Sequence, residues 1–113
     1  MLQPHFQVDV VEQGSGTILA LSGELDVASS PALEAELERA AGSKLIVVDL
    51  TELEFIDSTG LSVLVKAHQK SLENGSGFAL VRGTGQVQRL LGLTGMADQL
   101  PVAATREELL SET

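Results

Sequence analysis

Cysteine is absent from the 113-residue sequence, which excludes a disulfide framework and a metal site built on thiolates. Histidine is scarce as well, because His5 and His68 are the only two and lie far apart in the chain. A histidine-rich metal site is therefore not expected, and we predict neither a bound metal nor a cofactor. The chain is still long enough to bury one modest core without such links.

Basic residues are also few: 7 Lys and Arg stand against 16 Asp and Glu, which gives a net charge of −9. Because phosphate contacts dominate nucleic-acid affinity, a surface this acidic should be repelled by DNA and RNA, and also by anionic membranes. A protein partner with a basic docking surface is favoured instead. The charge alone names no partner, since acidity also keeps a protein soluble.

Long hydrophobic runs are missing too. The apolar stretches fall well short of the roughly 18 residues that a membrane span needs. The segment Met1–Phe6 lacks the charged region and the apolar stretch of a signal peptide. We therefore expect a cytoplasmic protein.

The pattern of apolar residues predicts a hairpin followed by alternating helix and strand. The turn Gln13–Gly16 separates two predicted strands, Phe6–Glu12 and Thr17–Ser22. Ser30-Pro31 offers an N-cap and a first helical residue, and Gly42 would end that helix. The next predicted elements are a buried strand at Leu45–Val48 and a helix at Ser58–Glu73, whose apolar face has Leu61, Leu64, Val65, His68 and Leu72. They are followed by a strand at Phe78–Val81, a short helix around Val87–Leu91 and an edge strand at Val102. A capping box of Thr105 and Glu108 predicts the start of a final helix, which runs through Leu110.

This order predicts an α/β fold in which residues 1–113 form one domain. An N-terminal β-hairpin followed by alternating helix and strand implies a mixed central β-sheet with helices packed against it. The connections between parallel strands should be right-handed crossovers. The pattern leaves open which face of the sheet each helix covers.

The stretch Val48–Leu61 is the most informative for function. A buried strand runs into a loop, and the loop ends in Asp57-Ser58-Thr59-Gly60 where a helix begins. Either Asp57 or Ser58 can be the N-cap, which places Ser58 at a helix N-terminus that would accommodate a phosphate group. Gly60, without a side chain, would let a partner come close. Since Asp, Ser and Thr are also ordinary helix caps, these residues alone do not establish a site.

The segment Ile56–Leu61, preceded by the strand Leu45–Leu50, resembles the signature of the anti-sigma-factor antagonists, the STAS domain family. Gly23–Asp26, just after the second strand, matches a second motif of that family, and Arg89–Gly95 resembles a third. The likeness extends over the region Phe6–Leu110, and the first two motifs together are specific.

The resemblance implies a switch protein without catalytic residues. In this family the serine at the position of Ser58 is phosphorylated by an anti-sigma factor that is itself an ATP-dependent serine kinase. The unphosphorylated antagonist binds this kinase and frees the sigma factor, phosphorylation ends the complex, and a serine phosphatase acting on the phosphoserine resets it. Thr59 is a secondary candidate for modification, and the free chain is expected to be a monomer. The partner-binding residues implied are Glu24, Asp26, Asp57, Ser58, Thr59, Gly60 and Leu61.

A phosphate on Ser58 would lie beside Asp57 and, if the two motif loops are neighbours, near Glu24 and Asp26. The helix terminus would compensate its charge locally, so the fold should survive. The added charge and bulk should instead prevent docking. We therefore predict a local switch with little change in the backbone.

Other functions fit parts of the sequence. The same family includes constitutive adaptors and scaffold subunits, for example of signalling complexes or lipid-transport systems, which need no phospho-switch. A hydrolase is not expected, because no G-x-S-x-G elbow is present and His68 lies too far along the helix to serve Ser58. No Walker loop supports a nucleotide site.

Several single residues keep two interpretations. Asp26 is either a turn residue or a contact for the kinase. Leu61 begins the apolar stripe of its helix and should pack in the core, yet the first turn of such a helix often faces a partner. His68 is expected to be a packed core histidine, and Lys66 and Lys70 are expected on a solvated helix face.

Overall fold

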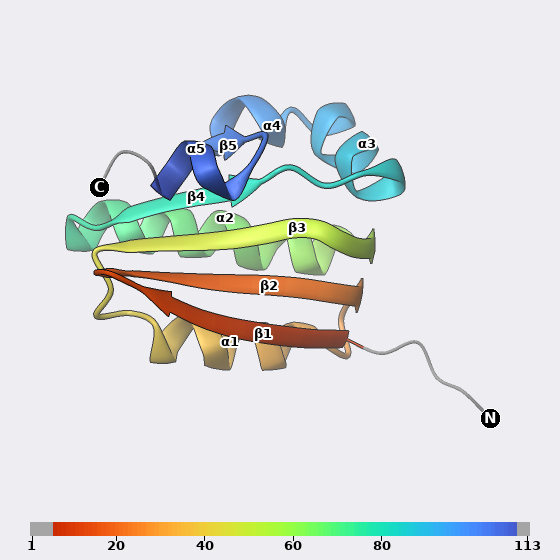
Figure 1. The fold of residues 1–113 in the computed structure, drawn as a ribbon. Helices are drawn as coiled ribbons and strands as arrows, with labels where there is room; N and C mark the ends of the chain where they lie inside the picture. The colour runs from red at the N-terminus through yellow and green to blue at the C-terminus, as the bar shows by residue number, and fades with distance from the viewer. Residues whose placement is uncertain (1–5, 111–113) are drawn as a thin grey trace.

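The computed structural model of the chain describes residues 6–110, which form one five-stranded sheet with helices on both faces (Figure 1). The strand order is β1-β2-β3-β4-β5, with β1 antiparallel to β2 and each later pair parallel. This confirms the predicted α/β fold, its N-terminal hairpin and its mixed sheet. The elements are β1 (Phe6–Gln13), β2 (Gly16–Leu25), α1 (Ser30–Arg39), β3 (Leu45–Ile56), α2 (Ser58–Asn74), β4 (Gly77–Val81), α3 (Gly85–Leu93), α4 (Met96–Gln99), β5 (Val102–Ala103) and α5 (Arg106–Leu110).

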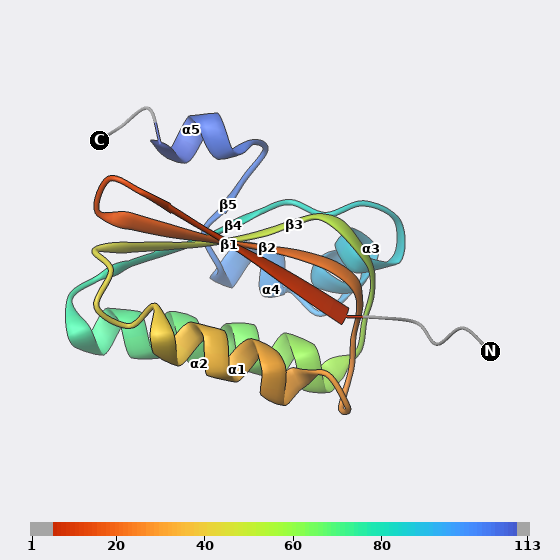
Figure 2. The same cartoon turned by 60° about the horizontal axis from the view of Figure 1, so that its bottom comes forward.

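The helices divide unequally between the two faces of the sheet. Figure 2 shows α1 to α4 on one face and the short α5 on the other. Leu33 of α1 and Leu64 of α2 belong to the main core together with Val48 of β3. The adjacent Val47 points to the opposite face, where a smaller cluster packs against Leu109 of α5. Both faces of β3 are therefore covered, as its continuous apolar run predicted.

Strand β3 is longer than predicted. The segment Thr51–Ile56, expected to be a loop, continues the strand and pairs in parallel with the end of β2. Its three polar residues, Thr51, Glu52 and Glu54, interrupt the apolar run and hid the strand from pattern reading, although Leu53 and Ile56 are buried. Register shifts in the β2–β3 pairing bend this end of the sheet. The second half of β3 thus depends on a partner strand from elsewhere in the chain.

The boundaries of α1 also differ from the prediction. The helix begins at Ser30 with Ser29 as its N-cap, one residue earlier than expected, and it ends at Arg39, before Gly42. The earlier start follows from Asp26, whose carbonyl accepts hydrogen bonds from the Ser30 backbone N–H at 2.9 Å and from the Ser30 hydroxyl at 2.7 Å.

Two further differences concern α2 and α4. The predicted apolar stripe of α2 fails at Leu72, which is 66% exposed. Ser71 is buried instead. The α4 helix was not predicted, since its four residues are too few to show a helical period.

Helix α5 is fastened to the sheet by an ion pair that has a predictable pH dependence. Arg106 Nε donates to Asp49 Oδ2 at 2.5 Å, and the Asp49 side chain is 7% exposed. Burial alone would raise the pKa of Asp49, but hydrogen bonds from Thr51 and Arg106 and the charge of Arg106 outweigh it and hold the pKa below its ordinary value of 3.8. The pair therefore stabilises the fold above that value, and its contribution is lost as the pH falls through the lowered pKa.

Asp49→Asn should lower the free energy of unfolding at neutral pH by about 1 to 3 kcal/mol, because a buried charge-assisted hydrogen bond is lost. It should also flatten the loss of stability below about pH 4. Urea unfolding at a series of pH values measures both effects. Glu36→Gln is the control, since its ion pair with Arg39 is on the surface and contributes little. An unchanged pH profile for Asp49→Asn would contradict this account.

Candidate functional site

The two segments that carry the main family motifs lie side by side at one end of the sheet. Because β2 and β3 are parallel, their carboxyl ends meet at the same edge, where Leu25 pairs with Ile56. The Asp57 backbone N–H extends this pairing by donating to the Leu25 carbonyl at 3.1 Å. Gly23–Asp26 and Ile56–Leu61 are thereby neighbours at the ends of parallel strands, where binding sites are commonly built.

Asp57 is the N-cap of α2. Its backbone is extended, and its Oδ1 accepts a hydrogen bond from the Gly60 backbone N–H at 2.9 Å. Of the two N-cap candidates the structure selects Asp57, so Ser58 is the first helical residue. Ser58 and Thr59 are both exposed. Their hydroxyl groups are accessible at the positive end of a 17-residue helix.

Gly60 is needed for the close approach of α2 to β2. A Cβ atom at Gly60 would lie 2.7 Å from Leu25 Cγ and 2.9 Å from the Leu25 carbonyl oxygen. The prediction that Gly60 leaves room for a partner needs correction, because the space is filled from within the fold. Leu61 also faces inward and is 7% exposed, which confirms its place in the core. A direct contact of Gly60 or Leu61 with a partner stays a prediction.

The connection from β2 to α1 is ordered by Asp26. Its Oδ1 accepts hydrogen bonds from the backbone N–H groups of Ala28 and Ser29, each at 3.1 Å, so Asp26 acts as a turn residue. Glu24 is half-buried at the end of β2. Val27, at the tip of the connection, is 69% exposed. The exposed Val27 therefore follows the acidic residues Glu24 and Asp26 in this connection, and a partner that binds at Ser58 could also contact Val27.

A shallow depression lies between the β2–α1 connection and the start of α2. It has a volume of about 380 Å³ and lies between the first turns of α1 and α2. Exposed Val27 and Ser58 both border it, so the β2–α1 connection and the start of α2 present one surface. Its lining residues are Val27, Ser30, Pro31, Glu34, Ser58, Thr59, Ser62, Val63 and Lys66.

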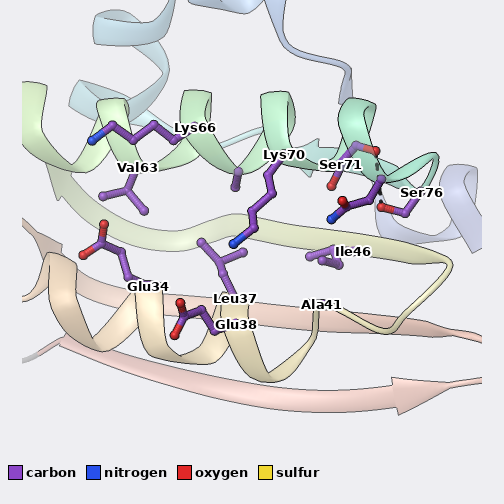
Figure 3. A pocket seen from close by; sticks show the side chains of 12 residues that line it. Glu34, Leu37, Glu38, Ala41, Ile46, Val63, Lys66, Lys70, Ser71 and Ser76 are labelled. Atoms are coloured by element: carbon purple, nitrogen blue, oxygen red, sulfur yellow. Dashed lines mark hydrogen bonds between the residues drawn. The ribbon is translucent and has the colours of Figure 1, made fainter.

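A second hollow continues along the two helices. This groove, of about 280 Å³, has Leu37, Ile46 and Val63 in its wall and charged side chains at its rim (Figure 3). Lys66 and Lys70 are exposed, as predicted for a solvated helix face, but both line this groove. Their position between two helices is a feature that the helical spacing alone did not reveal.

The family model of the STAS domain matches residues 7–109. The chain belongs to the STAS domain family. It is similar to the anti-sigma-B factor antagonist of Bacillus subtilis (strain 168), with 30% identity over 105 residues that cover 91% of this chain and 95% of the relative.

Solved structures agree with this assignment. An anti-sigma factor antagonist from Mycobacterium paratuberculosis has a TM-score of 0.84 at 29% identity, with 96% of this chain and 93% of that chain covered. SpoIIAA, solved in unphosphorylated and phosphorylated forms, shares the fold with TM-scores of 0.76 and 0.70 at 21% and 20% identity. The two alignments cover 96% of this chain and 95% and 98% of the SpoIIAA chains. The predicted STAS resemblance is therefore confirmed.

One residue that supports the site of this STAS domain was missed in the sequence. The Gln86 side chain of α3 accepts from the Ile56 backbone N–H at 2.9 Å and donates to the Ile56 carbonyl at 2.8 Å. These bonds fasten α3, which carries most of the third motif (Arg89–Gly95), to the strand end that precedes Ser58. A glutamine in the first turn of a short predicted helix gave no signal of such a contact.

Other predicted features concern the histidines, metals and membranes. The His68 ring lies 5.8 Å from the Phe78 ring, which agrees with a packed histidine of the STAS core. His5 lies outside the described residues. Within residues 6–110 no cluster of His, Asp or Glu could hold a metal ion. No helix in that same range has both the length and the apolar character to cross a bilayer.

Proposed function

We propose that this STAS domain is an anti-anti-sigma factor. Its unphosphorylated form binds an anti-sigma-factor serine kinase and frees a sigma factor to promote transcription. Phosphorylation of Ser58 ends this binding, and a serine phosphatase restores it. The protein acts in the bacterial cytoplasm as a binding partner and as a substrate of the kinase, and it is not itself an enzyme.

The position of Ser58 carries the proposal. Its side chain is exposed at the first residue of α2, beside the depression and the exposed Val27. A kinase can reach a hydroxyl at the end of a helix, and a phosphate there faces unpaired backbone N–H groups. Thr59 shares this exposure, which keeps it as the secondary candidate. SpoIIAA, which has the same fold, has been solved in a phosphorylated form.

The surroundings of Ser58 explain why a phosphate would end docking without unfolding the protein. The carboxylates of Asp26 and Asp57 already accept hydrogen bonds from backbone N–H groups, so a new charge does not displace them. A phosphate adds about −1.5 to −2 charges to a surface that must lose water in a complex. The free-energy cost of removing water from this charge therefore lowers the affinity of the complex and does not lower the stability of the fold.

The test is capture from the native cytosol followed by phosphorylation. Wild-type protein and Ser58→Ala should capture the same anti-sigma-factor kinase. With ATP, that kinase should add one phosphoryl group to the wild type, which mass spectrometry should locate on Ser58, and none to Ser58→Ala. Thr59→Ala should be modified like the wild type.

Two outcomes would contradict the proposal. Capture of a partner that is not a kinase would favour the alternative, a constitutive adaptor or scaffold subunit. Phosphorylation of Ser58→Ala at Thr59 to the wild-type extent would show that Ser58 is not the switch residue.

A further inference from the structure

Lys66 is the cation that lines the depression beside Ser58 in the described part of the chain. It follows Ser58 by about two turns of α2. Figure 3 shows the Lys66 side chain extended along α2 toward the N-terminal end of the helix, the direction in which helical side chains lean. Lys70, one turn further on, reaches across the groove toward α1 (Figure 3). Of the two lysines, Lys66 is the one directed toward Ser58.

Among the residues that the structure describes, the Lys66 ammonium group forms no ion pair. The ion pairs among residues 6–110 are Arg39–Glu36 and Arg106–Asp49. Glu34 of α1 lines the same depression from the opposite side, yet the two side chains do not form an ion pair. Lys66 is therefore able to take a new anionic partner without breaking an ion pair within residues 6–110.

The other charged residue that lines the depression in the described part of the chain is negative, and so are two neighbours of Ser58 in the motif loops. Glu34 faces the depression from α1, Asp26 lies in the β2–α1 connection, and Asp57 is the N-cap. A phosphate on Ser58 would be repelled by these carboxylates. The groups that attract it are the backbone N–H groups of the first turn and the Lys66 ammonium group.

We propose that Lys66 pairs with the phosphate on Ser58 and holds it over the depression between α1 and α2. This inference rests on the proposed phosphorylation of Ser58. The phosphate then covers the surface that includes Val27 and Pro31, so the modification adds charge and also closes the depression to a partner. Lys66 is a positioning residue of the switch.

The test is a titration by phosphorus NMR of protein that carries phosphoserine at position 58, incorporated during synthesis. A neighbouring cation favours the dianion, so the pKa of the phosphate should be higher in Lys66→Gln than with Lys66 present, by about half a unit for an exposed pair. Lys66→Arg should keep the lower pKa. High salt should reduce the difference.

Lys70→Gln is the matched control, since it removes the same charge one turn further along α2. Both lysines are exposed, so the variants should fold, which circular dichroism checks. An equal phosphate pKa in wild type and Lys66→Gln would overturn the proposal. An equal rise in Lys70→Gln would overturn it too, because it would show only an effect of net charge. The titration needs no kinase, so failure to find one would defeat the proposed function and leave this result interpretable.

Discussion

Ser58→Asp is expected to weaken binding of the anti-sigma-factor kinase by about 30-fold to 140-fold, while Ser58→Ala should change it by less than about threefold. A carboxylate that loses water at the interface without a partner costs about 2 to 3 kcal/mol. Alanine only removes a hydroxyl group that is exposed in the free protein. Isothermal titration calorimetry with the purified kinase measures both affinities.

The fold should be unaffected by this substitution. Ser58 is the first residue of α2, where a negative side chain interacts favourably with the helix N-terminus, so Tm should stay equal or rise slightly. Ser15→Asp is the control, since it adds the same charge in the β1–β2 turn at the other end of β2. An equal loss of affinity in Ser15→Asp, or a loss of structure in Ser58→Asp, would contradict a local switch at Ser58.

Gly60→Ala should lower the free energy of unfolding by about 1 to 3 kcal/mol, which for a domain of this size lowers Tm by about 5 to 15 °C. The added methyl group would collide with Leu25 Cγ at 2.7 Å and with the Leu25 carbonyl at 2.9 Å. Relief requires α2 to move away from β2, which also displaces Ser58. Thermal unfolding of the variant measures the loss, and its affinity for the kinase should fall with it.

Gly92→Ala is the matched control for this effect. Gly92 lies in α3, and a Cβ atom there meets nothing within 4 Å. Alanine should therefore stabilise this helix, by up to about 1 kcal/mol. If Gly60→Ala proved as stable as the wild type, the contact with Leu25 would not be the reason for a glycine at this position.

Much of the fold follows from local patterns. The turn Gln13–Gly16 predicted the hairpin, and the β-branched run Leu45–Val48 predicted a strand covered on both faces. The motif Ile56–Leu61 predicted a helix start with an accessible Ser58. Where the local pattern was weak, prediction failed: the second half of β3, in which polar and apolar residues are mixed, looked like a loop, and the stripe on α2 did not extend to Leu72.

The sequence by itself determined the order of the elements, the STAS assignment and the position of Ser58 at a helix N-terminus, because these depend on residues close together in the chain. The tertiary structure alone decided which distant residues meet. It placed Leu25 against Gly60, bonded Gln86 to Ile56 and set Lys66 beside the depression. Such contacts depend on the register of β2 with β3 and on how the helices pack, and local spacing carries no information about either.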